Sequence, residues 1–155
     1  MLQRIQSVWL FFSTATLFAL FLFPYVQVLD FGGTGRSIKV TGVYENINGQ
    51  VVQTEPFLTL TIATVILALL PFIIIFLYRN RKLQKTLCYV TILLIIGFSF
   101  WTAQVAKAEV GNISLGLGNY GLGVALMPIS ILFLVLALKG IRRDEKLIRS
   151  ADRLR

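Results

Sequence analysis

Residues 57–78 read FLTLTIATVILALLPFIIIFLY and contain no Asp, Glu, Lys or Arg. A helix needs about 20 mostly apolar residues to cross the hydrocarbon core of a bilayer, and this stretch is long enough. Three more uncharged apolar stretches lie at about residues 5–28, 86–106 and 120–138. We therefore predict an all-α membrane protein in which residues 1–155 form a single domain, a four-transmembrane-helix bundle.

The composition excludes several classes of protein and of chemistry. Of the 155 residues, 56% are hydrophobic and 14% are charged, which excludes a soluble globular domain, a disordered chain and a disulfide-rich scaffold. The chain has no histidine and one cysteine, Cys88, so a zinc site, a CxxC redox pair and a histidine base are excluded. We expect no cofactor, no bound metal and no enzymatic activity.

The basic residues predict the orientation of the spans. Twelve of the 15 Lys and Arg residues lie before 5–28, between 57–78 and 86–106, or after 120–138. The remaining segments, residues 29–56 and 107–119, hold three cations and four carboxylates. The positive-inside rule then places both termini in the cytoplasm and these two segments outside. Since orientation accounts for the net charge of +8, we expect no nucleic-acid partner.

The first outer segment contains a hairpin signal. Asn48-Gly49 stands between two β-prone runs, residues 38–44 and 47–52, and both turn residues tolerate positive φ. Residues 113–118 of the second outer segment alternate apolar with small residues, which favours a short strand that pairs with the hairpin in a small extracytoplasmic sheet. A flexible Gly-rich link is the alternative for 113–118. Tyr44 and Asn48 are the candidate contacts for an outer partner.

Two prolines lie inside predicted spans. Pro71 and Pro128 are each expected to bend their helix, because proline removes a backbone donor. Broken helices line substrate sites in some transporters, so a groove near these prolines is the basis of an alternative function. That alternative is an uncoupled small-solute transporter, a channel or a lipid-binding membrane protein. No ionisable side chain lies within the predicted spans, which argues against ion-coupled transport.

The last segment, residues 139–155, is predicted to form a cytoplasmic tail helix. Leu147, Ile148, Ala151 and Leu154 share one helical face among many cations. Such a helix can lie on an anionic inner leaflet or dock on a protein partner, and both interpretations stay open. The candidate contacts for lipid or partner on this side are Arg4, Arg142, Arg143, Asp144, Glu145, Lys146, Arg149, Asp152 and Arg153.

Two terminal motifs carry a resemblance to a known family. The chain starts with MLQRIQ at residues 1–6, and it ends with IRRDEKL at residues 141–147 and DRLR at residues 152–155. With these motifs it resembles an uncharacterised family of small four-span inner-membrane proteins from Bacteroidota, classed as a domain of unknown function. The resemblance implies a bacterial cytoplasmic membrane and brings no known activity or cofactor.

The predicted layout is also similar to that of claudin-type tetraspans, with a β-rich first outer loop and both termini inside. This is an analogy of architecture, and the tryptophan motif and cysteine pair of claudin first loops are missing here. We expect a non-enzymatic accessory or scaffolding subunit of a larger envelope complex. Its expected partners are the bilayer, with its anionic inner leaflet, and a membrane protein or a second copy of the chain.

Overall fold

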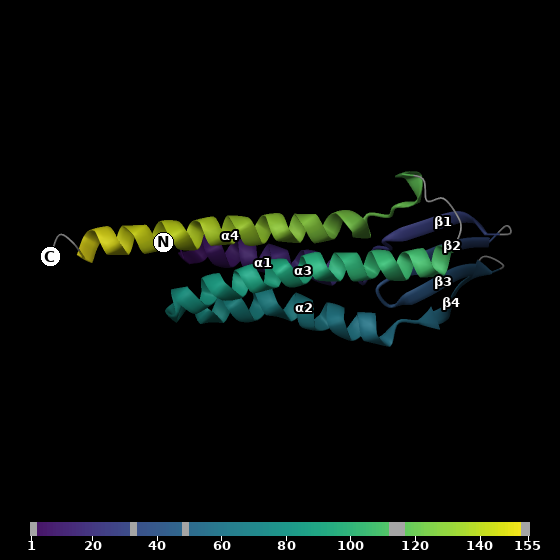
Figure 1. Cartoon of the computed structure of the whole chain (residues 1–155), viewed down its shortest axis with the longest axis horizontal. Helices are drawn as coiled ribbons and strands as arrows, with labels where there is room; N and C mark the ends of the chain where they lie inside the picture. The colour runs from purple at the N-terminus through teal and green to yellow at the C-terminus, as the bar shows by residue number, and fades with distance from the viewer. Residues whose placement is uncertain (1–2, 32–33, 48–49, 112–116, 153–155) are drawn as a thin grey trace.

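The computed structural model describes residues 3–31, 34–47, 50–111 and 117–152 (Figure 1). The α-helices in these ranges are α1 (Gln3–Ala19), α2 (Leu58–Phe76), α3 (Arg81–Val110) and α4 (Gly123–Asp152). The strands are β1 (Val26–Phe31), β2 (Thr34–Lys39), β3 (Gly42–Ile47) and β4 (Gln50–Pro56). Two short 3₁₀ helices cover Leu77–Arg79 and Leu117–Asn119.

The helices form a closed ring in which α1 and α3 each pack against both α2 and α4. The interior of the ring is apolar and well buried, with Leu10, Leu67, Ile95 and Leu134 at its centre. The outward faces also expose large apolar side chains, including Phe11 and Leu93 among many others. A chain that is apolar both inside and outside is suited to a lipid environment rather than to water.

Three of the helical segments are long and apolar enough to cross a membrane, namely Leu58–Arg79, Arg81–Val110 and Gly123–Glu145. The helix α1 is apolar but shorter, which differs from the predicted span at residues 5–28. The chain continues from Ala19 to Phe23 in tight turns, and the strand β1 follows Pro24. Proline disfavours a helical residue before it, and the β-branched Val26 pairs with Ile38 of β2 instead.

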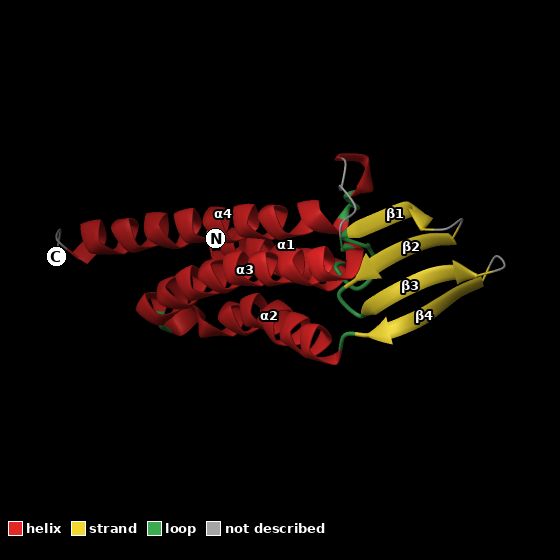
Figure 2. Ribbon diagram, turned by 45° about the vertical axis from the view of Figure 1, so that its right-hand side comes forward, coloured by secondary structure: helices red, strands yellow, loops and turns green. Residues whose placement is uncertain are grey.

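The strands make one antiparallel sheet in the order β1-β2-β3-β4, at the end of the bundle opposite the chain termini (Figure 2). Ile47 pairs with Gln50, which confirms the predicted hairpin between β3 and β4, although Asn48 and Gly49 themselves lie outside the described residues. The sheet also contains two hairpins that we did not predict, β1–β2 and β2–β3, and the second turns at Val40-Thr41 inside the β-prone run 38–44. The core side of the sheet buries Val26, Ile38 and Val43.

The prediction of a strand at residues 113–118 is wrong for the two of these residues that the structure describes, 117 and 118. Residues 113–116 lie outside the described residues, and Leu117–Asn119 forms a 3₁₀ helix. The loop meets the sheet through a single bridge from Tyr120 to Val26. The backbone N–H groups of Gly121 and Gly123 then donate to the carbonyls of Tyr25 and Pro24, so the loop docks at the start of β1 instead of adding a strand.

The helices α3 and α4 extend beyond the predicted spans at residues 86–106 and 120–138. The described part of the tail, residues 139–152, is helical as predicted and continues α4 without interruption. Figure 1 shows α4 extending past the other helices. Both helices that contain the predicted prolines are also continuous, with Pro71 buried in α2 and Pro128 exposed on α4. The bends at these prolines stay predictions.

Candidate functional site

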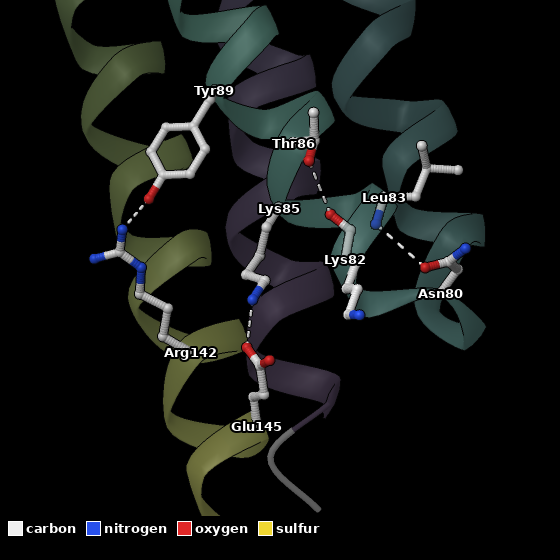
Figure 3. A network of polar contacts seen from close by, with 8 residues as sticks. All are labelled: Asn80, Lys82, Leu83, Lys85, Thr86, Tyr89, Arg142 and Glu145. Carbon is white, nitrogen blue, oxygen red and sulfur yellow. Dashed lines mark hydrogen bonds and ion pairs between the residues drawn. The ribbon is translucent and has the colours of Figure 1, made fainter.

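Polar contacts between helices concentrate at one end of the bundle, where α1 begins and α2 is followed by α3; we call it the basal end (Figure 3). Asn80 begins α3 there, because its side chain accepts a hydrogen bond from the Leu83 N–H over 3.2 Å. This start brings Lys85 and Tyr89 of α3 beside Arg142 and Glu145 of α4, as Figure 3 shows.

The first basal contact joins α1 to α4. Gln6 Nε2 donates a hydrogen bond to Asp144 Oδ2, and Gln6 and Asp144 are only 6% and 7% exposed. A carboxylate buried to this extent needs hydrogen-bond donors, because its burial is otherwise costly. Gly140 lies one turn before Asp144, and a Cβ there would be 2.9 Å from Gln6 Cγ. The glycine therefore gives Gln6 the space from which it reaches Asp144.

Two further contacts join α3 to α4 (Figure 3). Lys85 Nζ forms an ion pair with Glu145 Oε2, and both side chains are about three-quarters buried. The Arg142 guanidinium lies 5.7 Å from the centroid of the Tyr89 ring and donates a hydrogen bond to the Tyr89 hydroxyl. Since Asp144 and Glu145 both bind side chains of neighbouring helices, the acidic residues of the tail have a structural role at this end.

A groove of about 1170 Å³ opens between α1, α3 and α4 at the basal end. Its lining combines cations, carboxylates and apolar side chains. The polar and charged lining residues include Gln6, Lys85, Tyr89, Lys139, Arg142, Arg143, Asp144 and Glu145. The apolar ones are Ile5, Ile92, Val135, Leu136 and Leu138. The groove is amphiphilic rather than uniformly polar.

The structure brings together four of the predicted contact residues, Arg142, Arg143, Asp144 and Glu145, at this groove. Arg4 lies in α1, and Lys146, Arg149 and Asp152 lie in α4, but their side chains are outside the described part of the chain. Arg153 lies outside the described residues altogether. Gln6, Lys85 and Tyr89 were not among the predicted contacts. The sequence contains only a weak signal for these three residues, because each is simply a polar residue near the end of an apolar stretch.

The opposite end holds Tyr44, one of the two predicted outer contacts. Tyr44 is half-buried on β3, where its hydroxyl lies 2.9 Å from Thr41 Oγ1 and the Lys39 ammonium lies 5.2 Å from its ring centroid. Asn48 lies outside the described residues. Tyr25, beneath the sheet, is 3% exposed, and burial, with a smaller contribution from the charge of Glu109, raises the pKa of its hydroxyl above the ordinary value.

Hydroxyl groups inside the bundle are paired with nearby oxygen atoms. Ser13 Oγ and Ser130 Oγ lie 2.8 Å apart and link α1 to α4, while Thr64 Oγ1 donates to the Leu60 carbonyl over 2.7 Å. Within the described ranges no group of three His, Cys, Asp or Glu residues is arranged to hold a metal ion. These contacts provide helix packing and offer no nucleophile with a base beside it.

Comparison with protein families matches residues 2–154 to one described as a domain of unknown function, DUF4293. The chain belongs to this family. The match covers nearly all of the chain, so the bundle, the sheet and the basal groove all lie inside the DUF4293 domain. Comparison with curated proteins gives no match.

Proposed function

We propose that this DUF4293 protein is a non-enzymatic, four-span protein of a bacterial inner membrane, and that it serves as an accessory or scaffolding subunit of a larger envelope complex. The observation that carries the proposal is the free outer edge of the sheet. The chain composition supports it further, since a protein without histidine and with one buried cysteine has few groups for catalysis. The Bacteroidota origin suggested by the terminal motifs belongs to the same proposal.

The packing of α1 supports the four-span count. Gln6 meets Gly140 at the basal end, and Pro24 meets Gly123 at the sheet end. The part of α4 between these two glycines is about 26 Å long at 1.5 Å per residue. The segment from Gln6 to Pro24 therefore covers the same length of the bundle as a helix that can cross a membrane, although its helical part is shorter.

The charge distribution supports cytoplasmic termini, since the basal end and the tail carry most of the cations. The continuity of α4 through Gly140 bears on the two interpretations of the tail. A helix that lies flat on a leaflet needs a break where it leaves the span, and α4 has none between Gly123 and Asp152. This geometry favours a tail that projects toward a partner, within a claudin-like layout.

The outer docking surface that we propose is the edge strand β4. All seven of its residues are exposed, and Val51 and Val52 are 69% and 45% exposed. At the other edge, β1 is partly covered by the bridge to Tyr120. Glu55 and Pro56 lie at the end of β4 that leads into α2, whereas residues 50–54 carry no charge and no proline. This uncharged part with its exposed valines is a template for the addition of a partner strand, which natural proteins otherwise block with charges or proline.

Site-specific photo-cross-linking in host membranes tests this surface. A photoreactive residue at Val51 or Val52 is expected to give one defined adduct, because a strand added to β4 passes within contact distance of both. Ala108 is the matched control, since it is exposed near the same end of the bundle but lies on α3. The same adducts from Ala108, or none from either valine, would contradict a scaffolding role through β4.

The transporter alternative has less support. It placed a groove between the helices that contain Pro71 and Pro128, but these helices are not neighbours in the ring, and Pro128 is exposed on the outer side. The groove at the basal end lies between α1, α3 and α4 instead.

A further inference from the structure

The basal groove has two zones along the bundle axis. On α4, the apolar Val135 and Leu138 come before Lys139 and Arg143, so the character of the lining changes within about one helical turn. On α3, which runs the opposite way, Ile92 lies at the apolar end of the groove. A ligand that fits both zones has an anionic head and an apolar tail.

The carboxylates in the groove are already engaged within the chain. Asp144 accepts a hydrogen bond from Gln6 and is buried, and Glu145 is paired with Lys85. Their charges are therefore directed at α1 and α3. Lys139, Arg142 and Arg143 remain exposed along α4, and within the described residues Lys139 and Arg143 have no acidic partner. The groove thus presents uncompensated positive charge.

Arg142 is held in place for binding an anion. Its guanidinium lies over the Tyr89 ring and donates to the Tyr89 hydroxyl, which uses only part of its five N–H donors. A guanidinium fork matches the geometry of phosphate oxygens and is weakly hydrated, so it binds phosphate better than an ammonium does at such a site. Tyrosine is also typical of the membrane interface, where headgroups lie.

We propose that this groove binds one anionic phospholipid. Its phosphate lies against Arg142, Arg143 and Lys139, and one acyl chain lies along Ile92 and Val135. Val135 is 49% exposed, so the apolar zone is open to an acyl chain. The site selects for a diester phosphate that bears a net negative charge and is attached to a hydrocarbon chain. It requires only that the chain is in a membrane, and it stands independently of any partner on β4.

The test is native mass spectrometry of the full chain in mild detergent, titrated separately with phosphatidylglycerol and with zwitterionic phosphatidylethanolamine. The wild-type chain is expected to retain one phosphatidylglycerol with clear preference. Substituting both Arg142→Gln and Arg143→Gln is expected to weaken that binding about thirtyfold, and Lys139→Gln alone about fivefold, since each cation near anionic lipid contributes about 1 kcal/mol. Lys139 forms no ion pair within the described residues, so its variant separates lipid binding from folding.

The matched control is the pair Arg79→Gln with Lys82→Gln, which removes the same charge at exposed positions of the basal end outside the groove. It is expected to change the affinity less than twofold. An equal loss of phosphatidylglycerol affinity in the control pair would show that the lipid binds by general electrostatic attraction. That result would overturn the proposed lipid site in the groove. Competition by glycerol 3-phosphate or inorganic phosphate at equal concentration would show a free-phosphate site, and equal binding of both lipids would likewise contradict the proposal.

Discussion

Gln6 is a polar residue one turn into a helix that is otherwise mostly apolar, and its amide N–H donates a hydrogen bond to Asp144. The pair joins residues 138 positions apart, and both are buried. A hydrogen bond to a charged group stabilises more than a neutral one, and the loss of its donor leaves the carboxylate desolvated. At the scale of single residues, a buried polar contact thus joins α1 to α4 in addition to their apolar packing.

Gln6→Ala is expected to lower the free energy of unfolding by about 1–3 kcal/mol, because Asp144 stays buried without this donor. Denaturant or thermal unfolding in detergent measures the change. Gln104→Ala is the control, since Gln104 is exposed on α3, and its effect is expected to stay within about 0.5 kcal/mol. Equal effects of the two substitutions would show that the Gln6 contact adds nothing.

At the scale of elements, the start of α4 depends on two glycines that let it touch the turn before β1. A Cβ on Gly121 would lie 2.2 Å from the Pro24 carbonyl oxygen, and one on Gly123 would lie 2.8 Å from the same atom. Contacts under 3 Å to backbone cannot be relieved by rotating a side chain, so the backbone itself must move. The fourth helix and the sheet are thus joined by direct backbone contact.

Gly121→Ala is therefore expected to separate the loop from Pro24 and to lower the melting temperature of the protein. Gly97→Ala is the matched control on α3, where an added Cβ meets no atom within 4 Å. In that helix alanine is favoured over glycine by up to about 1 kcal/mol, so the control is expected to be neutral or stabilising. A thermal shift assay on both variants checks the opposite signs, and stabilisation by Gly121→Ala would refute the tight docking.

At the scale of the whole molecule, the ring of helices has its sheet at one end (Figure 1) and the ion pair between α3 and α4 at the other. An even number of crossings keeps both termini on the basal side, whereas three crossings would separate them. The four-span proposal therefore requires that the segment containing α1 crosses the membrane. This can be tested without knowledge of any partner.

Cysteine labelling tests it in a Cys88→Ser background, which removes the buried native thiol. Gln50→Cys is expected to react with a membrane-impermeant maleimide in spheroplasts, because the proposed topology places β4 outside. Lys82→Cys, and an epitope tag placed ahead of α1, are expected to become accessible only after permeabilisation. A tag that is accessible from outside while Lys82→Cys is protected would show that α1 does not cross the membrane.

The elements that could be predicted are those with a local signal. Uncharged apolar stretches predicted α2, α3 and the membrane part of α4, and Asn48-Gly49 predicted the β3–β4 hairpin. The β1–β2 hairpin had a comparable signal in Gly32-Gly33, which we did not use. The end of α1 was misplaced because hydropathy alone does not separate an apolar strand from an apolar helix.

The basal contacts could not be predicted in the same way. The structure pairs Glu145 with Lys85 of a different helix, because the packing of α3 against α4 brings the two together. Contacts between residues this far apart follow from the helix arrangement, which no local pattern contains.

The orientation of the strands sets how far the protein reaches from the membrane. Strands β2, β3 and β4 lie roughly along the long axis of the molecule, at the end of the bundle that carries the sheet (Figure 1). A strand of six residues is about 20 Å long, whereas the headgroup layer on one side of a bilayer is only about 5–8 Å thick. If the helices span the bilayer as proposed, about a third of the sheet, the part nearest the helices, is at headgroup depth. In the proposed four-span arrangement, the tip, with Ile47 and Val51, extends past the headgroups into water, where a soluble partner can reach it without touching lipid.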